Sequence, residues 1–184
     1  MPALIADILS LALAAFVFLM LVTAVVNLFI RVPYVPSRKK IVRHLIKLAN
    51  IQNGQTIYDL GCGDGRFLVE AEKMAHHENK KIQAIGFELA PLPFLLAQLK
   101  KLIYRCKFKV SMKNFFHENL SKADMIFCYL GPETLKKLAG KMQKECRKGT
   151  KIYSHTFKIE GMTPAKVWVK NPERNLPTIY LYQI

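Results

Sequence analysis

The nine residues 58–66 constrain the fold of this chain more than any other segment. They read Tyr-Asp-Leu-Gly-Cys-Gly-Asp-Gly-Arg and follow directly on a short apolar run. Glycine permits the backbone angles of a tight turn and lets the chain approach a ligand closely. A second apolar run, residues 82–87, ends in another acid, Glu88. A glycine turn after one strand and an acid at the end of the next are typical of a doubly wound α/β domain that binds a nucleoside.

The residues around these glycines distinguish between nucleotide cofactors. A nicotinamide-binding G-x-G-x-x-G motif would need a glycine in place of Arg66, and the phosphate-binding motif G-x-x-x-x-G-K-[ST] does not occur. Asp59 and Asp64 flank the glycines, where they would repel a pyrophosphate and attract a positively charged cofactor. S-adenosylmethionine carries a sulfonium and an ammonium group, and Glu88 stands where its ribose would need an acceptor. We therefore predict S-adenosylmethionine as the cofactor.

Strands and helices are expected to alternate from residue 56 onward. The predicted strands are residues 56–60, 81–88, 107–112, 124–129, 151–157, 165–169 and 178–183. The predicted helices of this region are residues 66–75, 91–104 and 132–144. This alternation favours a Rossmann-like α/β fold with a mostly parallel sheet, closed by an antiparallel strand near the end of the chain.

The N-terminal segment is predicted to be a transmembrane helix. Residues 8–30 contain no charged side chain, and these 23 residues as a helix would span roughly 34 Å, against a hydrocarbon core of about 30 Å. A cleavable signal peptide would have a basic start and a shorter apolar core. A buried core helix is the other alternative, although the apolar residues here surround the whole helix instead of forming one stripe.

The charges that follow this helix predict its orientation. Five basic residues and no acid stand in the next stretch: Arg31, Arg38, Lys39, Lys40 and Arg43. Basic residues remain on the cytoplasmic side of a membrane. We therefore expect the N-terminus outside and the rest of the chain in the cytoplasm. The four cysteines form no C-x-x-C pair, which agrees with a reducing compartment.

A proline-containing linker, residues 32–37, joins the first helix to a second one. Each proline fixes its own backbone angle and favours an extended conformation before it. Ser37 is expected to cap the second helix, whose apolar face comprises Ile41, Val42, Leu45, Ile46 and Ala49. The chain is therefore divided into an anchor (residues 1–31), a linker with a capping helix (32–50) and an α/β domain (51–184).

The chain is strongly basic, and its charge bears on its partners. The net charge is +15, and all 28 Lys and Arg lie after residue 30. Such a surface would face anionic lipid headgroups or an acidic protein substrate. A nucleic-acid partner is disfavoured, because no basic strand interleaved with aromatic residues and no RNA-binding signature occurs. No His, Cys or carboxylate cluster has the spacing of metal ligands, so no metal is expected.

Several short motifs make the chain similar to a known family. They are residues 33–37 (PYVPS), 58–66, 114–116 (NFF), 154–157 (SHTF) and 180–182 (YLY). With these the chain resembles the class I, seven-strand S-adenosylmethionine-dependent methyltransferases. The resemblance is narrower to the archaeal protein-lysine methyltransferases and to the mitochondrial family that methylates lysines of the ATP synthase c-subunit and the adenine nucleotide translocase.

The resemblance implies roles for individual residues. Those implied to bind the cofactor are Asp59, Gly61, Cys62, Gly63, Gly65, Glu88, Leu89, Asn114, Phe115 and Ser37. Glu88 would hold the ribose, and Asn114 and Phe115 would meet the adenine. Many relatives carry Asp in place of Asn114, but an amide also donates and accepts hydrogen bonds. Tyr129 and Tyr34 are the implied catalytic residues: Tyr129 would face the transferred methyl, and Tyr34 would cover the site.

The implied function is a membrane-anchored methyltransferase that acts on lysine side chains of proteins. Two alternatives stay open: a methyltransferase for a lipid or another membrane-associated small molecule, and a cofactor-binding scaffold without catalysis. Tyr129, Tyr34 and Glu133 are unranked candidates for binding the substrate amine. His155 is expected to be a strand residue with satisfied hydrogen bonds.

Overall fold

The computed structural model describes residues 1–30 and 35–184 of the chain. Its helices are α1 (Pro2–Ile30), α2 (Lys39–Ala49), α3 (Arg66–His77), α4 (Pro91–Ile103), α5 (Pro132–Glu145) and the short 3₁₀ helix η1 (Phe115–His117). Its strands are β1 (Thr56–Leu60), β2 (Gln83–Phe87), β3 (Lys109–Ser111), β4 (Met125–Cys128), β5 (Lys151–His155), β6 (Lys166–Trp168) and β7 (Ile179–Gln183).

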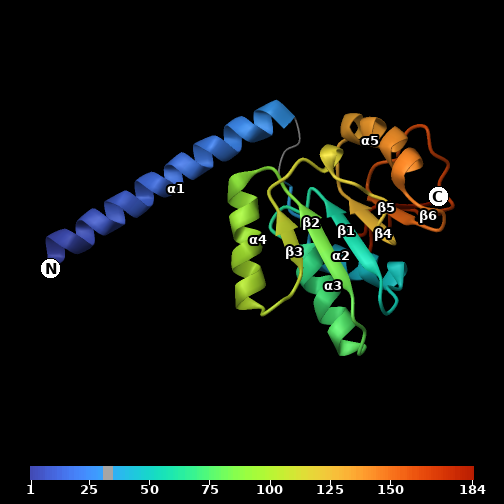
Figure 1. Cartoon of the computed structure of the whole chain (residues 1–184), viewed down its shortest axis with the longest axis horizontal. Coiled ribbons are helices and arrows are strands. Elements are labelled where there is room, and N and C mark those ends of the chain that lie inside the picture. The colour runs from blue at the N-terminus through green and yellow to red at the C-terminus, as the bar shows by residue number, and fades with distance from the viewer. Residues whose placement is uncertain (31–34) are drawn as a thin grey trace.

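The strands of the described chain form one sheet in the order β3-β2-β1-β4-β5-β7-β6 (Figure 1). The first five strands of the chain pair in parallel, β7 is antiparallel to β5, and β6 is antiparallel to β7. The predicted Rossmann-like fold, mostly parallel with an antiparallel closing strand, is therefore confirmed.

Helices cover both faces of the sheet, because successive side chains of a strand point to opposite faces. Ile57 of β1 belongs to one buried cluster together with residues of α2 and α3, among them Val42 and Leu68. Leu60 of the same strand belongs to the other cluster, which includes Leu135 of α5. Buried strands with apolar side chains on both faces are what a parallel sheet requires.

Several predicted boundaries differ from the structure by one or more residues. The strand predicted at residues 107–112 is only Lys109–Ser111, and the helix predicted at 66–75 continues to His77. The prediction that Ser37 caps α2 is wrong, because Arg38 holds the cap position and no side chain caps this helix. The carbonyl oxygen of Ser37 instead accepts a hydrogen bond of 2.6 Å from Nη1 of Arg66, which ties the segment before α2 to the start of α3.

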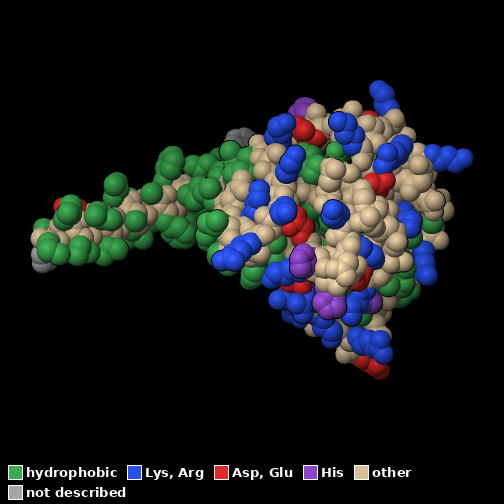
Figure 2. Space-filling model, turned by 60° about the horizontal axis from the view of Figure 1, so that its bottom comes forward, with side chains coloured by type: hydrophobic (Ala, Val, Ile, Leu, Met, Phe, Trp, Pro, Cys, Tyr) green, Lys and Arg blue, Asp and Glu red, His purple; other side chains and the backbone are tan. Residues whose placement is uncertain are grey.

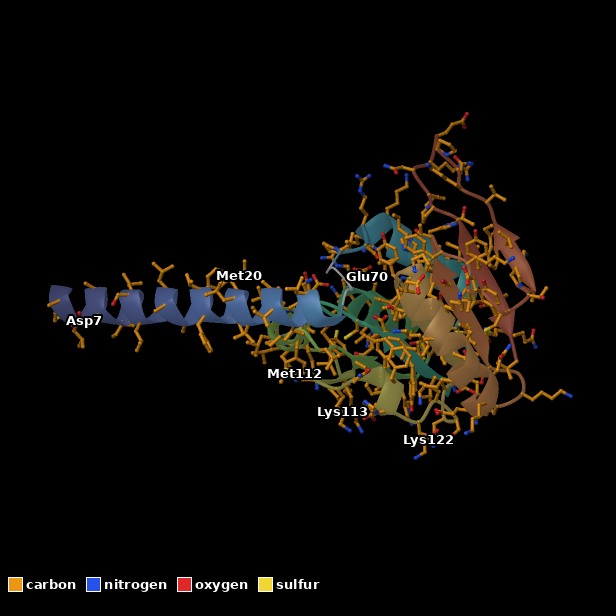
Figure 3. All side chains as sticks on the ribbon, turned by 90° about the horizontal axis from the view of Figure 1, so that it is seen from above. Asp7, Met20, Glu70, Met112, Lys113 and Lys122 are labelled. Carbon is orange, nitrogen blue, oxygen red and sulfur yellow. The ribbon has the colours of Figure 1, made fainter. Side chains whose placement is uncertain are left out.

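Helix α1 extends away from the sheet domain (Figure 1). Hydrophobic side chains cover it (Figure 2), and they project to several sides along its length (Figure 3). By length and composition, its segment Ala3–Val26 could cross a membrane, a test that a signal sequence also passes. Near its C-terminal end α1 lies against α4, where Thr23 Oγ1 accepts a hydrogen bond of 3.1 Å from the backbone N–H of Leu92.

Candidate functional site

A cavity of about 350 Å³ lies where β1, β2 and β4 end. Ligands of open α/β sheets bind at this edge, outside the carboxyl ends of the strands. The loop after β1, the residues after β2 and β4, the start of η1 and the end of β5 line the cavity, and α2 closes one side. Ten of the predicted site residues are brought together in this lining: Ser37, Asp59, Gly61, Cys62, Gly63, Glu88, Leu89, Asn114, Phe115 and Tyr129.

The glycine loop is held against the end of β2 by its backbone. The N–H groups of Gly61 and Cys62 both donate to the carbonyl oxygen of Phe87, each at 3.0 Å. Gly61 and Gly63 have φ of 75° and 55°, a region that L side chains rarely adopt. The loop therefore follows the floor of the cavity with its backbone exposed to a ligand, in a conformation that glycine allows.

Glu88 connects this loop to the start of α4. Its Oε2 accepts a hydrogen bond of 2.9 Å from the N–H of Gly63, and its Oε1 accepts one of 2.8 Å from the N–H of Ala90. Burial raises the pKa of Glu88, while the hydrogen bonds from these backbone groups act in the opposite direction. Each carboxylate oxygen keeps a lone pair that could accept a further hydrogen bond from a ligand.

Asp59 is the most strongly perturbed acid of the cavity. Its side chain is buried at the end of β1, and burial together with the charges of Glu88 and Asp64 raises the pKa of Asp59 to about 8. A carboxyl group with this environment would be stabilised in its ionised form by a cation placed beside it. The cavity therefore favours a ligand that carries positive charge at this point.

Asp64 has a different role from the one its position in the sequence predicts. It accepts hydrogen bonds from Nε and Nη2 of Arg66 at 2.8 and 2.6 Å, and it is also paired with Lys100 of α4. Burial opposes the ionisation of Asp64, but these two cations hold the pKa of its carboxyl well below its usual range. Because its charge is already compensated, the attraction for a cationic ligand comes from Asp59 and Glu88.

Asn114 and Phe115 form the start of η1 beside the cavity. The side-chain oxygen of Asn114 accepts a hydrogen bond of 3.0 Å from the N–H of Phe116 and so caps this short helix. The amide nitrogen of Asn114 takes no part in that bond. The ring of Phe115 is buried, and its centroid lies 4.9 Å from that of the Phe116 ring at an interplanar angle of 38°, which makes this wall of the cavity aromatic.

Tyr129 and His155 meet at the other end of the cavity. Their rings are 4.1 Å apart between centroids in an edge-to-face arrangement, and both residues line the cavity. Only 6% of His155 is exposed, and burial lowers its pKa to about 4, so the imidazole is neutral at physiological pH. Among the described residues, its Nε2 is a buried side-chain atom without a hydrogen-bond partner. The expectation that His155 is fully satisfied was therefore wrong.

The backbone directly after His155 is strained. Thr156 has φ of 72°, which is unusual for a β-branched residue. Its N–H donates to the carbonyl oxygen of Thr178 at 2.8 Å, and Ser154 Oγ donates to the carbonyl oxygen of Phe157 at 2.6 Å. Strained residues persist where the surrounding structure holds them, and they are common at functional sites. The SHTF motif was the signal in the sequence that could have pointed to His155.

Two other predicted residues, Gly65 and Glu133, do not join the lining. Tyr34 lies outside the described residues. Gly65 begins α3 behind the loop, where a Cβ atom would come within 3.0 Å of the Cβ of Ala97 on α4. Glu133 is exposed in the first turn of α5, as expected of an acid at a helix N-terminus, and does not line the cavity.

A known protein family matches most of the domain. A family model described as the ANTKMT methyltransferase domain matches residues 59–166. A protein of Saccharolobus islandicus named as a protein-lysine N-methyltransferase is 35% identical over 156 residues, which cover 83% of this chain and 94% of that protein.

Solved structures with a similar fold bind a cofactor product. An RNA methyltransferase from Salinibacter ruber in complex with S-adenosyl-L-homocysteine superposes with a TM-score of 0.72 and 24% identity, covering 82% of this chain and 94% of that one. A methyltransferase from Geobacter sulfurreducens, also with S-adenosyl-L-homocysteine, has a TM-score of 0.52 and 17% identity over 74% of this chain and 53% of that one. At these identities the two matches establish the fold.

Proposed function

The chain belongs to the family of the ANTKMT methyltransferase domain and is an S-adenosylmethionine-dependent methyltransferase, and from this premise we propose that it methylates lysine side chains of proteins. The prediction of S-adenosylmethionine as the cofactor is confirmed by the family match and by the product found in similar folds. The observation that carries the choice of lysine is the 35% identity to a protein-lysine methyltransferase over almost the whole of that relative.

The residues of the cavity fit this cofactor. The buried Asp59, with its raised pKa, suits the cationic methionine end, and the backbone of Gly61 and Gly63 leaves room for it. Glu88 keeps acceptor capacity for the ribose hydroxyls on both carboxylate oxygens. The amide nitrogen of Asn114, which takes no part in the bond to Phe116, and the ring of Phe115 suit the adenine. When bound, S-adenosylmethionine supplies an electrophilic methyl group on its sulfonium.

Tyr129 and His155 are proposed to hold the acceptor amine. A lysine ammonium has an ordinary pKa of about 10.4 and must lose a proton before it can act as a nucleophile. A buried, largely apolar site lowers that pKa, so a strong base is not required. In the tautomer that carries its proton on Nδ1, 3.4 Å from Thr156 Oγ1, the neutral imidazole of His155 offers Nε2 as an acceptor for the amine. The Tyr129 ring beside it aligns the alkyl chain. Positioning and exclusion of water are then the main contributions of the protein.

We further propose that α1 anchors the enzyme in a membrane with the domain on the cytoplasmic side. The support is the 24-residue apolar segment Ala3–Val26, which is almost entirely unburied, and the basic residues that follow the helix. Extraction of membranes with alkaline carbonate tests this, because it releases peripheral proteins and leaves a spanning helix in the pellet. N-terminal sequencing of the mature protein separates an anchor from a cleaved signal sequence.

Incubation of the enzyme and membranes with methyl-labelled cofactor tests the substrate class. Label recovered as methyllysine after protein hydrolysis would support a protein-lysine methyltransferase. Label that moves into the organic extract would instead identify a lipid or another small acceptor. A Glu88→Ala variant in parallel controls for transfer that does not depend on this site.

A further inference from the structure

The outward half of α4 is apolar, although it lies on the surface of the domain. Five apolar residues of this helix are exposed: Leu95, Leu96, Leu99, Leu102 and Ile103, here called the α4 face. Leu102 is 76% exposed and Ile103 is 63% exposed. A surface helix of a soluble domain normally carries polar residues on this side. We propose that the α4 face rests on the lipid bilayer, as a second membrane contact beside α1.

The opposite side of α4 explains why these leucines cannot turn inward. Ala97 is completely buried and lies directly over Gly65 at the start of α3, where even one added methyl group would come within 3.0 Å of it. Lys100, beside this buried side, pairs with Asp64 of the glycine loop. The orientation of α4 is therefore set by its contacts with the domain, and the exposed leucines are a consequence of that orientation.

The position of α1 places the α4 face at the depth of a membrane surface. Thr23 of α1 is buried against α4, and Leu19, Val22 and Val26 on the same side of α1 are partly buried. All four lie in the apolar segment Ala3–Val26, within about 10 Å of its C-terminal end at the rise of an α-helix. Interfacial helices lie about 5–10 Å deep at the boundary between headgroups and acyl chains. The inference therefore rests on the proposed anchoring by α1.

The surrounding surface fits this orientation. Figure 1 shows α4 on the side of the domain from which α1 projects, and in Figure 2 the hydrophobic surface of α1 continues onto the adjoining part of the domain. Lys101, Arg105 and Lys107 lie at and beyond the C-terminal end of α4. Basic residues next to a membrane are attracted by anionic headgroups. A soluble partner on the α4 face would have to enter this headgroup layer, which is why the bilayer is the better occupant.

Quenching of tryptophan fluorescence by brominated lipids tests the proposal on the full chain. Trp168 is the one tryptophan of the sequence, so a Trp168→Phe background, which keeps an aromatic ring against Tyr153, is silent. Single probes are then placed at Leu99→Trp on the α4 face, Leu13→Trp on α1 and Lys144→Trp on α5. Each protein is reconstituted into phosphatidylcholine vesicles whose acyl chains are brominated either near the headgroup or near the chain end.

The proposal expects Leu99→Trp to be quenched several times more strongly than Lys144→Trp, and more by bromine near the headgroup than near the chain end. If Leu13→Trp is quenched and Leu99→Trp is not, the α4 contact is wrong and the anchor stands. If Leu13→Trp is not quenched either, the anchor fails and this inference with it. Cross-linked dimers with an unquenched Leu99→Trp would identify a second copy of the chain as the occupant. Methyllysine formation is measured on each variant. Quenching without any methyllysine would count against the proposed lysine methylation and leave the membrane contact standing.

Discussion

The side chain of Glu88 accepts a hydrogen bond of 2.9 Å from the backbone N–H of Gly63. The two residues come from different strand ends, and the bond ties the glycine loop after β1 to the end of β2. The same carboxylate also accepts from Ala90, at the start of α4. Glu88 therefore shapes the glycine loop and, as proposed, also receives the ribose. A change at this residue should act on cofactor binding through both effects.

Replacement of Glu88 by Gln is expected to weaken binding of S-adenosylhomocysteine about 10- to 100-fold, because hydrogen bonds to a charged group contribute about 1.5–3 kcal/mol. One amide oxygen cannot replace two carboxylate oxygens that each accept a bond. Isothermal titration calorimetry measures the affinity directly. Glu160→Gln, at an exposed ion pair with Lys136, is the matched control and should bind as the wild type does. Equal affinity of Glu88→Gln and wild type would contradict the ribose assignment.

Cofactor binding should release protons through Asp59. The pKa of about 8 means that this carboxyl is mostly protonated at neutral pH, and a cation beside it favours the ionised form. Binding therefore lowers the pKa of Asp59, so the affinity should rise as the pH increases toward about 8 and level off above it. Calorimetry in buffers of different ionisation enthalpy counts the protons released. Asp59→Asn should release fewer protons, and an unchanged count would show that another group titrates.

Removal of the Nε2 acceptor of His155 should slow methyl transfer without weakening cofactor binding. His155→Phe keeps an aromatic ring against Tyr129 and lacks the nitrogen, and we expect its turnover to fall by roughly 10-fold or more. His155→Ala removes the ring as well and reports the packing contribution. Single-turnover methylation assays and S-adenosylhomocysteine titrations on each variant separate the two effects. Wild-type turnover in His155→Phe would remove this residue from the acceptor site.

Gly65→Ala should destabilise the fold through strain and crowding together. Gly65 has φ of 71°, and a Cβ atom there would come within 3.0 Å of Ala97. We expect a loss of about 1–3 kcal/mol in the free energy of unfolding. Gly54→Ala is the matched control, because Gly54 has φ of 83° but open space around its Cβ position. Denaturant unfolding should show a smaller loss for Gly54→Ala, and equal losses would mean that contact with α4 plays no part.

Local patterns in the sequence determined the architecture and the cofactor. Apolar runs separated by glycines and prolines predicted every strand of the sheet to within a few residues, because burial on a parallel sheet requires such runs. The loop at residues 58–66 and Glu88 indicated the cofactor, since the chemistry of a sulfonium ligand restricts both the turn and its acids. The sequence also showed that the apolar stretch in α1 is long enough to cross a membrane.

Only the tertiary structure decided which charged side chains are paired and which side of a helix is exposed. Asp64 looks like a cofactor ligand in the sequence, yet Lys100, 36 residues away, takes up its charge. His155 looks like an ordinary strand residue, yet the fold places it beside Tyr129 in the cavity lining, and its buried Nε2 has no hydrogen-bond partner among the described residues. The sequence predicted α4 as a helix, and the packing of Ala97 on Gly65 turns its leucines outward. Each outcome depends on contacts between residues far apart in the chain, which periodicity and spacing do not contain.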